Sequence, residues 1–273
     1  WFQQFKGNIF FCFVNPCDFG AHSFEGTSNY FYEVFFEDAK VCARDLGLAL
    51  TSREKGENAV PMAGFPHHQL ESYLGKLIAA GFRVAVCDQV EDPKQAKGLV
   101  RREVTRVVTP GTVTDEALLD PRQSNYLAAV ARGDPAGVSW VELSTGRFVA
   151  ATFPRRQLAD QLARLSPTEC LLAEGADPIP GYLSEQMMLT RRPDWAFAQR
   201  SARDALAKHF GTATLEGFGF APEHDGPAIR AAGAILDYLS ETQKSSLDHI
   251  ERLIPYRTGD ALDQNRHALV VVD

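Results

Sequence analysis

The chain has 273 residues, of which 45% are hydrophobic and 23% are charged, and its formal net charge is −7. This composition excludes a disordered protein, and the length allows two domains of ordinary size. The acidic balance excludes a protein that binds nucleic acid through bulk electrostatics alone, so any such contact must come from a local basic patch.

The sequence gives no indication of export. No apolar run approaches the length of a membrane span, and the N-terminus lacks a basic region followed by an apolar core. We therefore expect an unexported cytoplasmic protein without a membrane partner. The five cysteines are irregularly spaced, which favours reduced thiols over a disulfide framework.

The first 117 residues read as an α/β unit with a mixed sheet. A helix is expected over 35–46, because apolar residues recur there at helical spacing and Gly47 suits the position after a helix. The stretch "PMAGFP" reads as a rigid turn that leads into a second helix, which ends at Gly81. The strands expected here are 48–52, 82–90 and 100–110, and the polar loops are 53–59 and 91–98.

A linker-like stretch over 112–125 precedes a new pattern, and we place the domain linker itself at 118–125. Three short strands joined by turns of hairpin length, then a helix and another strand, predict a second α/β domain over 126–250. The expected strands are 125–132, 137–143, 147–153 and 169–173, and the expected helices are 155–164, 199–210 and 227–242.

The stretch "NYFYEVFFEDAK" (29–40) combines five aromatic residues with three acids. In an extended segment Phe31 and Glu33 point to one side and Tyr32 to the other, because side chains alternate along a strand. One interpretation is a strand with Phe31 in the core and Glu33 in solvent. The other is a wedge, in which the ring enters a base step of duplex DNA and the carboxyl addresses a base edge.

A local basic patch exists in "KQAKGLVRREVTR" (94–106), where Lys97, Arg101 and Arg102 stand near a single acid, Glu103. A charge run of this kind is either a solvated face or a contact surface for DNA.

The histidines and cysteines do not predict a metal site. Adjacent residues such as His67 and His68 project apart on a helix. Cys12, Cys17 and His22 are five residues apart, unlike the ligands of a zinc knuckle.

Four specific motifs in a fixed order carry a resemblance to a known family. They are "FYE" (31–33), "PMAG.PHH" (61–68), "DPK.AKG" (92–98) and "R.VTPGT" (106–112). From Phe31 to about Asp120 the chain resembles the mismatch-recognition domain of bacterial DNA mismatch repair proteins of the MutS family. "GVSWVELSTGRF" and "AAGAILDYLSETQKSSLDHI" resemble the connector domain of that family and the segment that leads into its core.

The resemblance implies roles for matched residues. Phe31 resembles the residue that stacks on the mispaired base, and Glu33 the residue that hydrogen-bonds to it. Met62 and Arg102 fall where the family contacts DNA near the lesion. The candidate DNA-binding residues are therefore Phe31, Glu33, Met62, Arg102, Arg101 and Lys97.

The resemblance also implies an RNase H-like α/β connector without catalysis, which serves communication between domains and with a MutL-like protein. The residues agree, because RNase H-type nucleases need several carboxylates on Mg²⁺. The strand at 125–132 has none, and only Glu142 stands in the next. The start of a helical core is expected at 251–273.

The family implies a homodimer in the full-length protein, which acts on mismatched duplex DNA in the bacterial nucleoid. Its ATPase domain binds ATP and Mg, but no G-x-x-x-x-G-K-[ST] phosphate loop is present in this chain. We therefore expect a fragment that is not itself an enzyme and that holds no cofactor.

One stretch departs from the family pattern. Nineteen residues (12–30) separate the strand-like "NIFF" from Phe31, where the family has about four, and Asn29-Tyr30 replaces a Gly-Asp pair. The stretch is either a genuine insertion or an unrelated N-terminal sequence.

Two functions follow from these residues. The first is recognition of mismatched or unpaired bases for DNA repair, by wedge insertion and DNA kinking. The second is a non-catalytic protein-interaction scaffold derived from a MutS-like paralogue, without DNA binding of its own. Basic residues on the same face as Phe31 and Glu33 would favour the first, and basic residues on the opposite face would favour the second.

Overall fold

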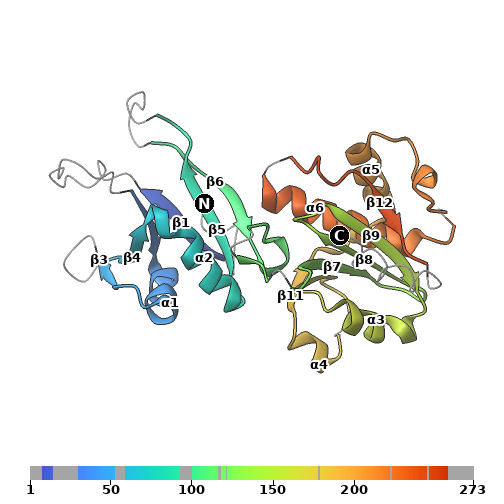
Figure 1. Cartoon of the computed structure of the whole chain (residues 1–273), viewed down its shortest axis with the longest axis horizontal. Helices are drawn as coiled ribbons and strands as arrows, with labels where there is room; N and C mark the ends of the chain where they lie inside the picture. The colour runs from blue at the N-terminus through green and yellow to red at the C-terminus, as the bar shows by residue number, and fades with distance from the viewer. Residues whose placement is uncertain are drawn as a thin grey trace, which may run out of the picture. The chain divides into compact units, whose positions relative to one another are not determined.

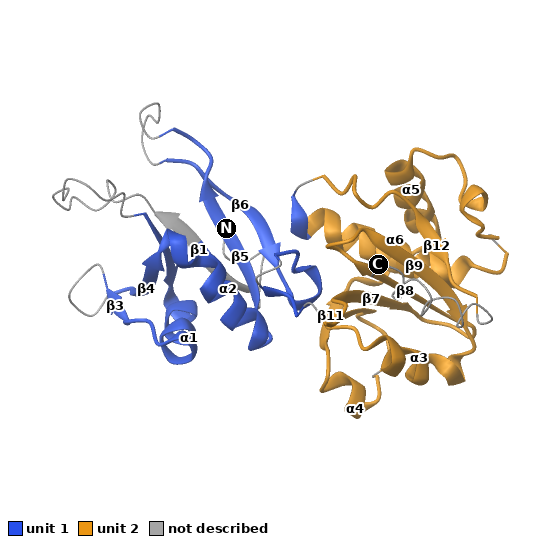
Figure 2. Ribbon diagram, in the orientation of Figure 1, with its two compact units in different colours: residues 1–120, 242–245 blue, residues 121–241, 246–273 orange. Residues whose placement is uncertain are grey.

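The computed structural model describes residues 8–14, 30–52, 59–92, 100–115, 118–120, 122–177, 179–221, 223–244 and 246–257. The chain divides into two compact units, unit 1 (1–120 and 242–245) and unit 2 (121–241 and 246–273) (Figure 2). Each unit has its own six-stranded sheet. The predicted mixed α/β class is confirmed.

Unit 1 contains a mixed sheet in the order β3-β4-β2-β1-β5-β6. β1 runs parallel to β5 and antiparallel to β2, and the other neighbours are antiparallel. The strand that carries the aromatic and acidic motif, β2, therefore has a partner on each side. The strands are β1 (Asn8–Val14), β2 (Phe31–Phe35), β3 (Thr51–Ser52), β4 (Pro61–Pro66), β5 (Arg83–Gln89) and β6 (Arg102–Val108).

Two helices, α1 (Phe36–Leu46) and α2 (Leu70–Ala79), pack against one face of this sheet (Figure 1). α1 ends at Gly47, whose φ of 70° lies in the left-handed region that favours glycine. The buried residues of α2 are Leu70, Leu74 and Leu77, which recur at helical spacing.

The core of unit 1 follows from the alternation of side chains along its strands. Tyr32 and Val34 of β2 and Ala63 and Phe65 of β4 are buried in the cluster that also contains the helix residues. The Phe65 ring meets the ring of Phe11 edge-on, with their centroids 4.9 Å apart. The residues between these positions therefore face away from the helices.

Both helices predicted in this unit are confirmed, as are the strands at 82–90 and 100–110, with ends shifted by a few residues. The turn predicted for "PMAGFP" is wrong, because Pro61–Pro66 forms β4 and pairs with β2 and β3. The two prolines stand at the ends of the strand, where a missing N–H costs least. Residues 53–58 and 93–98 of the predicted loops lie outside the described residues.

Unit 2 contains a second mixed sheet in the order β11-β10-β7-β8-β9-β12. β7, β8 and β9 are antiparallel, while β10 and β11 continue in parallel beside β7. This order is consistent with the RNase H-like fold that the resemblance implies. The strands are β7 (Tyr126–Ala131), β8 (Ala136–Glu142), β9 (Arg147–Phe153), β10 (Glu169–Ala173), β11 (Met188–Arg192) and β12 (Leu253–Pro255).

Helices cover both faces of this sheet (Figure 1). Leu127 and Ala129 of β7 face the cluster that contains α5 and α6, whereas Ala128 and Val130 face the cluster that contains α3 and α4. The helices are α3 (Leu158–Leu165), α4 (Gly181–Ser184), α5 (Gln199–Phe210) and α6 (Gly226–Gln243). Short 3-10 helices lie at His67–Gln69, Pro110–Thr112, Arg155–Gln157, Asp194–Phe197 and Glu216–Phe218.

The helices and strands predicted between 125 and 242 are all confirmed. The strand β11 was not predicted from the sequence. β12 lies in the range assigned to the start of a helical core, yet it pairs in parallel with β9. Just beyond it, the Arg257 guanidinium holds the buried Asp225 carboxylate at 2.6 Å. The domain boundaries at 117, 125 and 250 stay predictions.

The described part of the chain contains no helix long and apolar enough to cross a membrane. Within the same residues no group of histidines, cysteines and acids could hold a metal ion, and Cys17 and His22 lie outside them. Cys42 and Cys170 are free thiols. Burial raises the pKa of both Cys42 and Cys170 to about 12, which keeps them protonated at neutral pH.

Candidate nucleic-acid interface

The exposure of Phe31 and Glu33 in β2 is the reverse of what their side-chain chemistry predicts. Phe31 is 36% exposed although it is a large apolar residue, while Glu33 is only 6% exposed although it is acidic. The interpretation with Phe31 in the core and Glu33 in solvent is therefore wrong. The helix-covered face is already filled by Tyr32 and Val34, so Phe31 and Glu33 lie on the other face.

A glycine makes room for the Glu33 side chain. Glu33 pairs with Gly64 of β4. A Cβ added at Gly64 would lie 3.2 Å from Cγ of Glu33 and 2.9 Å from the backbone oxygen of Tyr32. The sequence reasoning assigned no role to Gly64, because only the strand register places it beside Glu33.

The strand register places Arg102 at the same end of the sheet as Phe31. Glu33 of β2 pairs with Cys12 of β1, Cys12 pairs with Cys87 of β5, and Cys87 pairs with Val104 of β6. These four residues form one row across the sheet. Phe31 and Arg102 each lie two residues beyond this row in the same direction.

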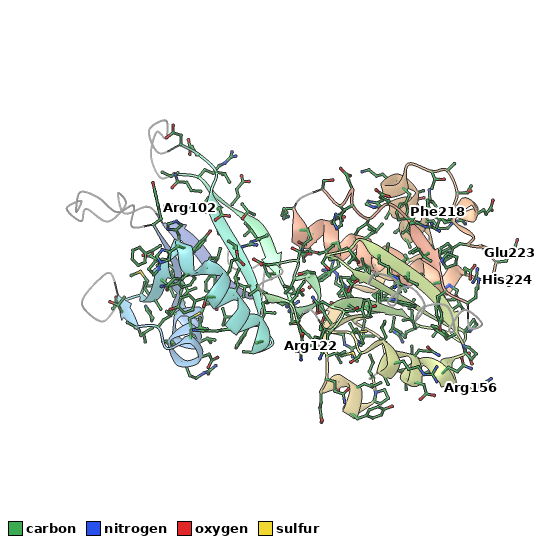
Figure 3. The ribbon with its side chains drawn as sticks, in the orientation of Figure 1. Arg102, Arg122, Arg156, Phe218, Glu223 and His224 are labelled. Atoms are coloured by element: carbon green, nitrogen blue, oxygen red, sulfur yellow. The ribbon has the colours of Figure 1, made fainter. Side chains whose placement is uncertain are left out.

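Arg102 also faces the same side of the sheet as Phe31. Asp88 reaches the Tyr32 hydroxyl on the helix-covered side. Its neighbour Gln89 therefore points to the opposite side, and Arg102 points there with it as its cross-strand partner. Arg102 is labelled in Figure 3.

The other predicted residues differ in placement. Met62 pairs with Phe35, so it belongs to the helix-free face at the far end of β2 from Phe31. Arg101 alternates away from Arg102 and forms a 3.2 Å ion pair with Glu103. Lys97 lies outside the described residues. We name the group of Phe31, Glu33, Met62 and Arg102 the open face.

A partly buried hydrogen-bond network lies on the helix-covered side of the sheet, behind the open face. The Tyr32 hydroxyl donates to Asp88 Oδ1 at 2.7 Å, and the Thr105 hydroxyl donates to the other oxygen of the same carboxylate. Burial, this hydrogen bond and the charge of Asp88 raise the pKa of Tyr32. The network ties β2 to β5 and β6, which are the strands that carry Phe31, Gln89 and Arg102.

Sequence reasoning missed this network. Tyr32 and Asp88 are 56 positions apart in the chain. Thr105 lies where the pairing of β5 with β6 is irregular, so a regular alternation would not have placed it beside Asp88.

Fold and face together define a class: a two-unit α/β protein whose first sheet carries an exposed ring, a buried carboxyl and a guanidinium on one side. Residues 27–117 match the family model of MutS domain I, and residues 125–251 match that of MutS domain II. The chain belongs to the MutS family.

Curated relatives support this assignment. The chain is 53% identical over 254 residues to DNA mismatch repair protein MutS of Rhodopirellula baltica, an alignment that covers 85% of this chain and 28% of the relative. The protein of the same name from Acaryochloris marina is 44% identical over 85% of the chain, and that from Syntrophomonas wolfei is 40% identical over 86%; both alignments cover 28% of the relative. The chain thus spans about 28% of the length of these relatives.

The matched ranges are domains I and II of the family, not its ATPase domain.

Proposed function

We propose that the chain recognises mismatched or unpaired bases in duplex DNA as part of DNA mismatch repair. The observation that carries the proposal is the exposed Phe31 ring, which lies at the same end of the sheet as Arg102 and two residues from the buried Glu33 carboxyl in β2. The named relatives are DNA mismatch repair proteins, which supports the same interpretation.

The Phe31 ring acts as a wedge that stacks on a base and kinks the duplex. A mispaired base stacks and pairs poorly, so opening its step costs less than opening a matched step, by about a few kcal/mol. The ring therefore converts a local weakness of the duplex into a difference in binding free energy. The hydrogen-bond network behind β2 holds the strand in place, so that the DNA bends and the Phe31 ring does not move.

Glu33 hydrogen-bonds to the displaced base, and Arg102 contacts the phosphate backbone. A carboxylate is repelled by phosphates, so it is useful only where it addresses a base edge. A guanidinium binds phosphate oxygens in a fork and positions the duplex without reading its sequence. Met62 and Lys97 complete the proposed DNA contacts, whereas Arg101 points away from the open face and pairs with Glu103.

We assign residues 1–117 to the DNA-binding domain, 118–125 to the linker and 126–250 to the connector, whose sheet β12 extends. The connector would transmit the bound state to other domains and to a MutL-like partner. In the full-length protein, which works in the bacterial cytoplasm on nucleoid DNA, two protomers would form a homodimer, and ATP and Mg would bind in another domain.

The test is a titration of the 273-residue chain with matched and singly mismatched duplexes at two salt concentrations. Phe31→Ala should abolish the preference for mismatched DNA and leave weak non-specific binding. Base–aromatic stacking of about 1–3 kcal/mol corresponds to a loss of roughly 5- to 150-fold in mismatch affinity. Phe36→Ala is the matched control, because Phe36 is an exposed phenylalanine just past the other end of β2.

Equal discrimination by wild type and Phe31→Ala would refute the wedge. No DNA binding by the chain or by the full-length protein would instead favour the protein-interaction scaffold.

A further inference from the structure

A second site, unrelated to the open face, lies in unit 2. A cavity of about 200 Å³ opens between helix α3 and the strands β7, β8 and β9. We call it the α3 cavity. Its lining includes the aromatic residues Trp140, Phe153 and Tyr256 and the polar residues Arg147, Gln161 and Arg164.

Three separate segments of the chain form the aromatic wall of the α3 cavity. Tyr256 follows β12, and its ring centroid lies 5.8 Å from Trp140 on β8 and 6.0 Å from Phe153 on β9. Trp140 and Tyr256 are only half-buried, so part of each ring remains accessible. Such rings offer flat surfaces for stacking a planar ligand.

The charge of the α3 cavity is one-sided. Arg147 and Arg164 are exposed, and none of the described residues that line the cavity is acidic. Within the described part of the chain neither guanidinium forms an ion pair. Other arginines of unit 2 do, since Arg192 pairs with Asp237 and Glu241 and Arg257 pairs with Asp225.

One nearby acid does not cancel this charge. Glu142 stands opposite Arg147 in the strand register, but it lines no part of the cavity. Its Oε2 accepts a hydrogen bond from the Thr145 hydroxyl at 2.9 Å. The cavity thus has the two positively charged guanidinium groups of Arg147 and Arg164 beside its aromatic wall.

We infer that the α3 cavity binds a nucleoside phosphate. The base stacks on the Trp140 ring, as bases stack on aromatic side chains elsewhere, and meets the edge of the Tyr256 ring, because the two ring planes stand at 67° to each other. The phosphate is held by Arg147 and Arg164, whose planar forks match its oxygens. The Gln161 amide, which both donates and accepts, meets the edge of the base. Nothing in the proposed mismatch recognition uses these residues.

A nucleoside phosphate can reach this cavity either as a free nucleotide or as part of a single strand. Calorimetry of the 273-residue chain with AMP, and separately with a single-stranded oligonucleotide of six deoxyadenosines, distinguishes the two sources. An oligonucleotide that binds at least about tenfold more tightly than AMP identifies a strand. Comparable affinities identify a free nucleotide.

Three variants test the site itself. Arg147→Gln combined with Arg164→Gln should weaken AMP binding by about tenfold or more, and Trp140→Leu should do the same through lost stacking. Arg200→Gln is the matched control, because Arg200 is a highly exposed arginine on α5, which packs on the other face of the sheet. It should leave the affinity unchanged.

Several outcomes would overturn the inference. They are the absence of binding by either probe, an affinity that the Arg147 and Arg164 substitutions do not change, and tighter binding of an acidic, tyrosine-containing peptide than of either nucleotide probe. Binding of the oligonucleotide that depends on Arg102 instead would assign it to the open face and remove it from the α3 cavity.

Discussion

Replacement of Tyr32 by phenylalanine removes one hydroxyl from the network that supports the open face. The hydroxyl donates to Asp88 Oδ1 at 2.7 Å, and the residue is buried. Phenylalanine keeps the ring and its packing against Phe65, 6.0 Å away between centroids. Asp88 keeps its hydrogen bond from Thr105. The change therefore isolates one partly buried hydrogen bond to a carboxylate.

A hydrogen bond to a charged group contributes about 1.5–3 kcal/mol. Asp88 is half-buried, so water can replace part of the lost interaction, and we expect a loss near 2 kcal/mol. Some amides of unit 1 exchange their hydrogen only when the whole unit unfolds. The loss of about 2 kcal/mol should raise the exchange rate of these amides about 30-fold. Hydrogen exchange measured on peptides from β2 and β5 reports unit 1 separately from unit 2.

The pH dependence follows from the raised pKa of Tyr32. Its folded pKa lies above the ordinary value of 10.0, so the unfolded chain loses the phenolic proton first as pH rises. The stability that this group contributes is complete below pH 10 and decreases above it, by at most about 1.4 kcal/mol per pH unit. Tyr32→Phe lacks this pH dependence. The difference in the free energy of unfolding between the variant and the wild type should therefore become smaller above about pH 10.

Two comparisons can refute this reasoning. Tyr182→Phe, at an exposed tyrosine on α4, should change neither stability nor its pH dependence. In a double-mutant cycle, Tyr32→Phe and Asp88→Asn should be coupled by about 1 kcal/mol or more. Additive effects, or the same loss for Tyr182→Phe, would show that the hydrogen bond does not stabilise unit 1.

Three further predictions concern the open face and its junction with α1. Arg102→Ala should weaken matched and mismatched duplex binding alike and reduce the salt slope by about one unit; a loss confined to one mispair would contradict a backbone contact. If Glu33 takes up a proton to donate to the displaced base, mismatch affinity should rise from about pH 8 to 6, and Glu33→Gln should bind matched DNA more tightly and lose both discrimination and pH dependence; equal pH slopes would refute this. Phe36 has a φ of 57° and is 53% exposed, so Phe36→Gly should raise the free energy of unfolding by about 0.5–1 kcal/mol in urea denaturation, and a decrease would show that contacts of the ring outweigh the strain.

Local patterns predicted the elements that carry their own periodicity. The helix at 199–210 and the strand at 169–173 match the structure at both ends. β4 escaped prediction because its two buried residues, Ala63 and Phe65, alternate inside a stretch that two prolines make turn-like. β12 has only three residues, too few for any period to show.

The open face was predictable in part, because the alternation of side chains along a strand can be read from the sequence. Alternation alone puts Phe31 and Glu33 on one side of β2, and the structure agrees. The burial of Glu33 depends on Gly64, and the position of Arg102 at the same end of the sheet as Phe31 depends on three strand pairings. Such contacts join distant parts of the chain, so no local window of sequence contains them.

The pairing of β12 with β9 has a practical consequence for dissecting this protein. A connector cut at residue 250 would leave one edge of β9 with unsatisfied N–H and C=O groups, a template for intermolecular strand pairing. It would also leave Asp225 without the Arg257 guanidinium. A piece that extends through Arg257 should remain monomeric at concentrations where the shorter piece aggregates.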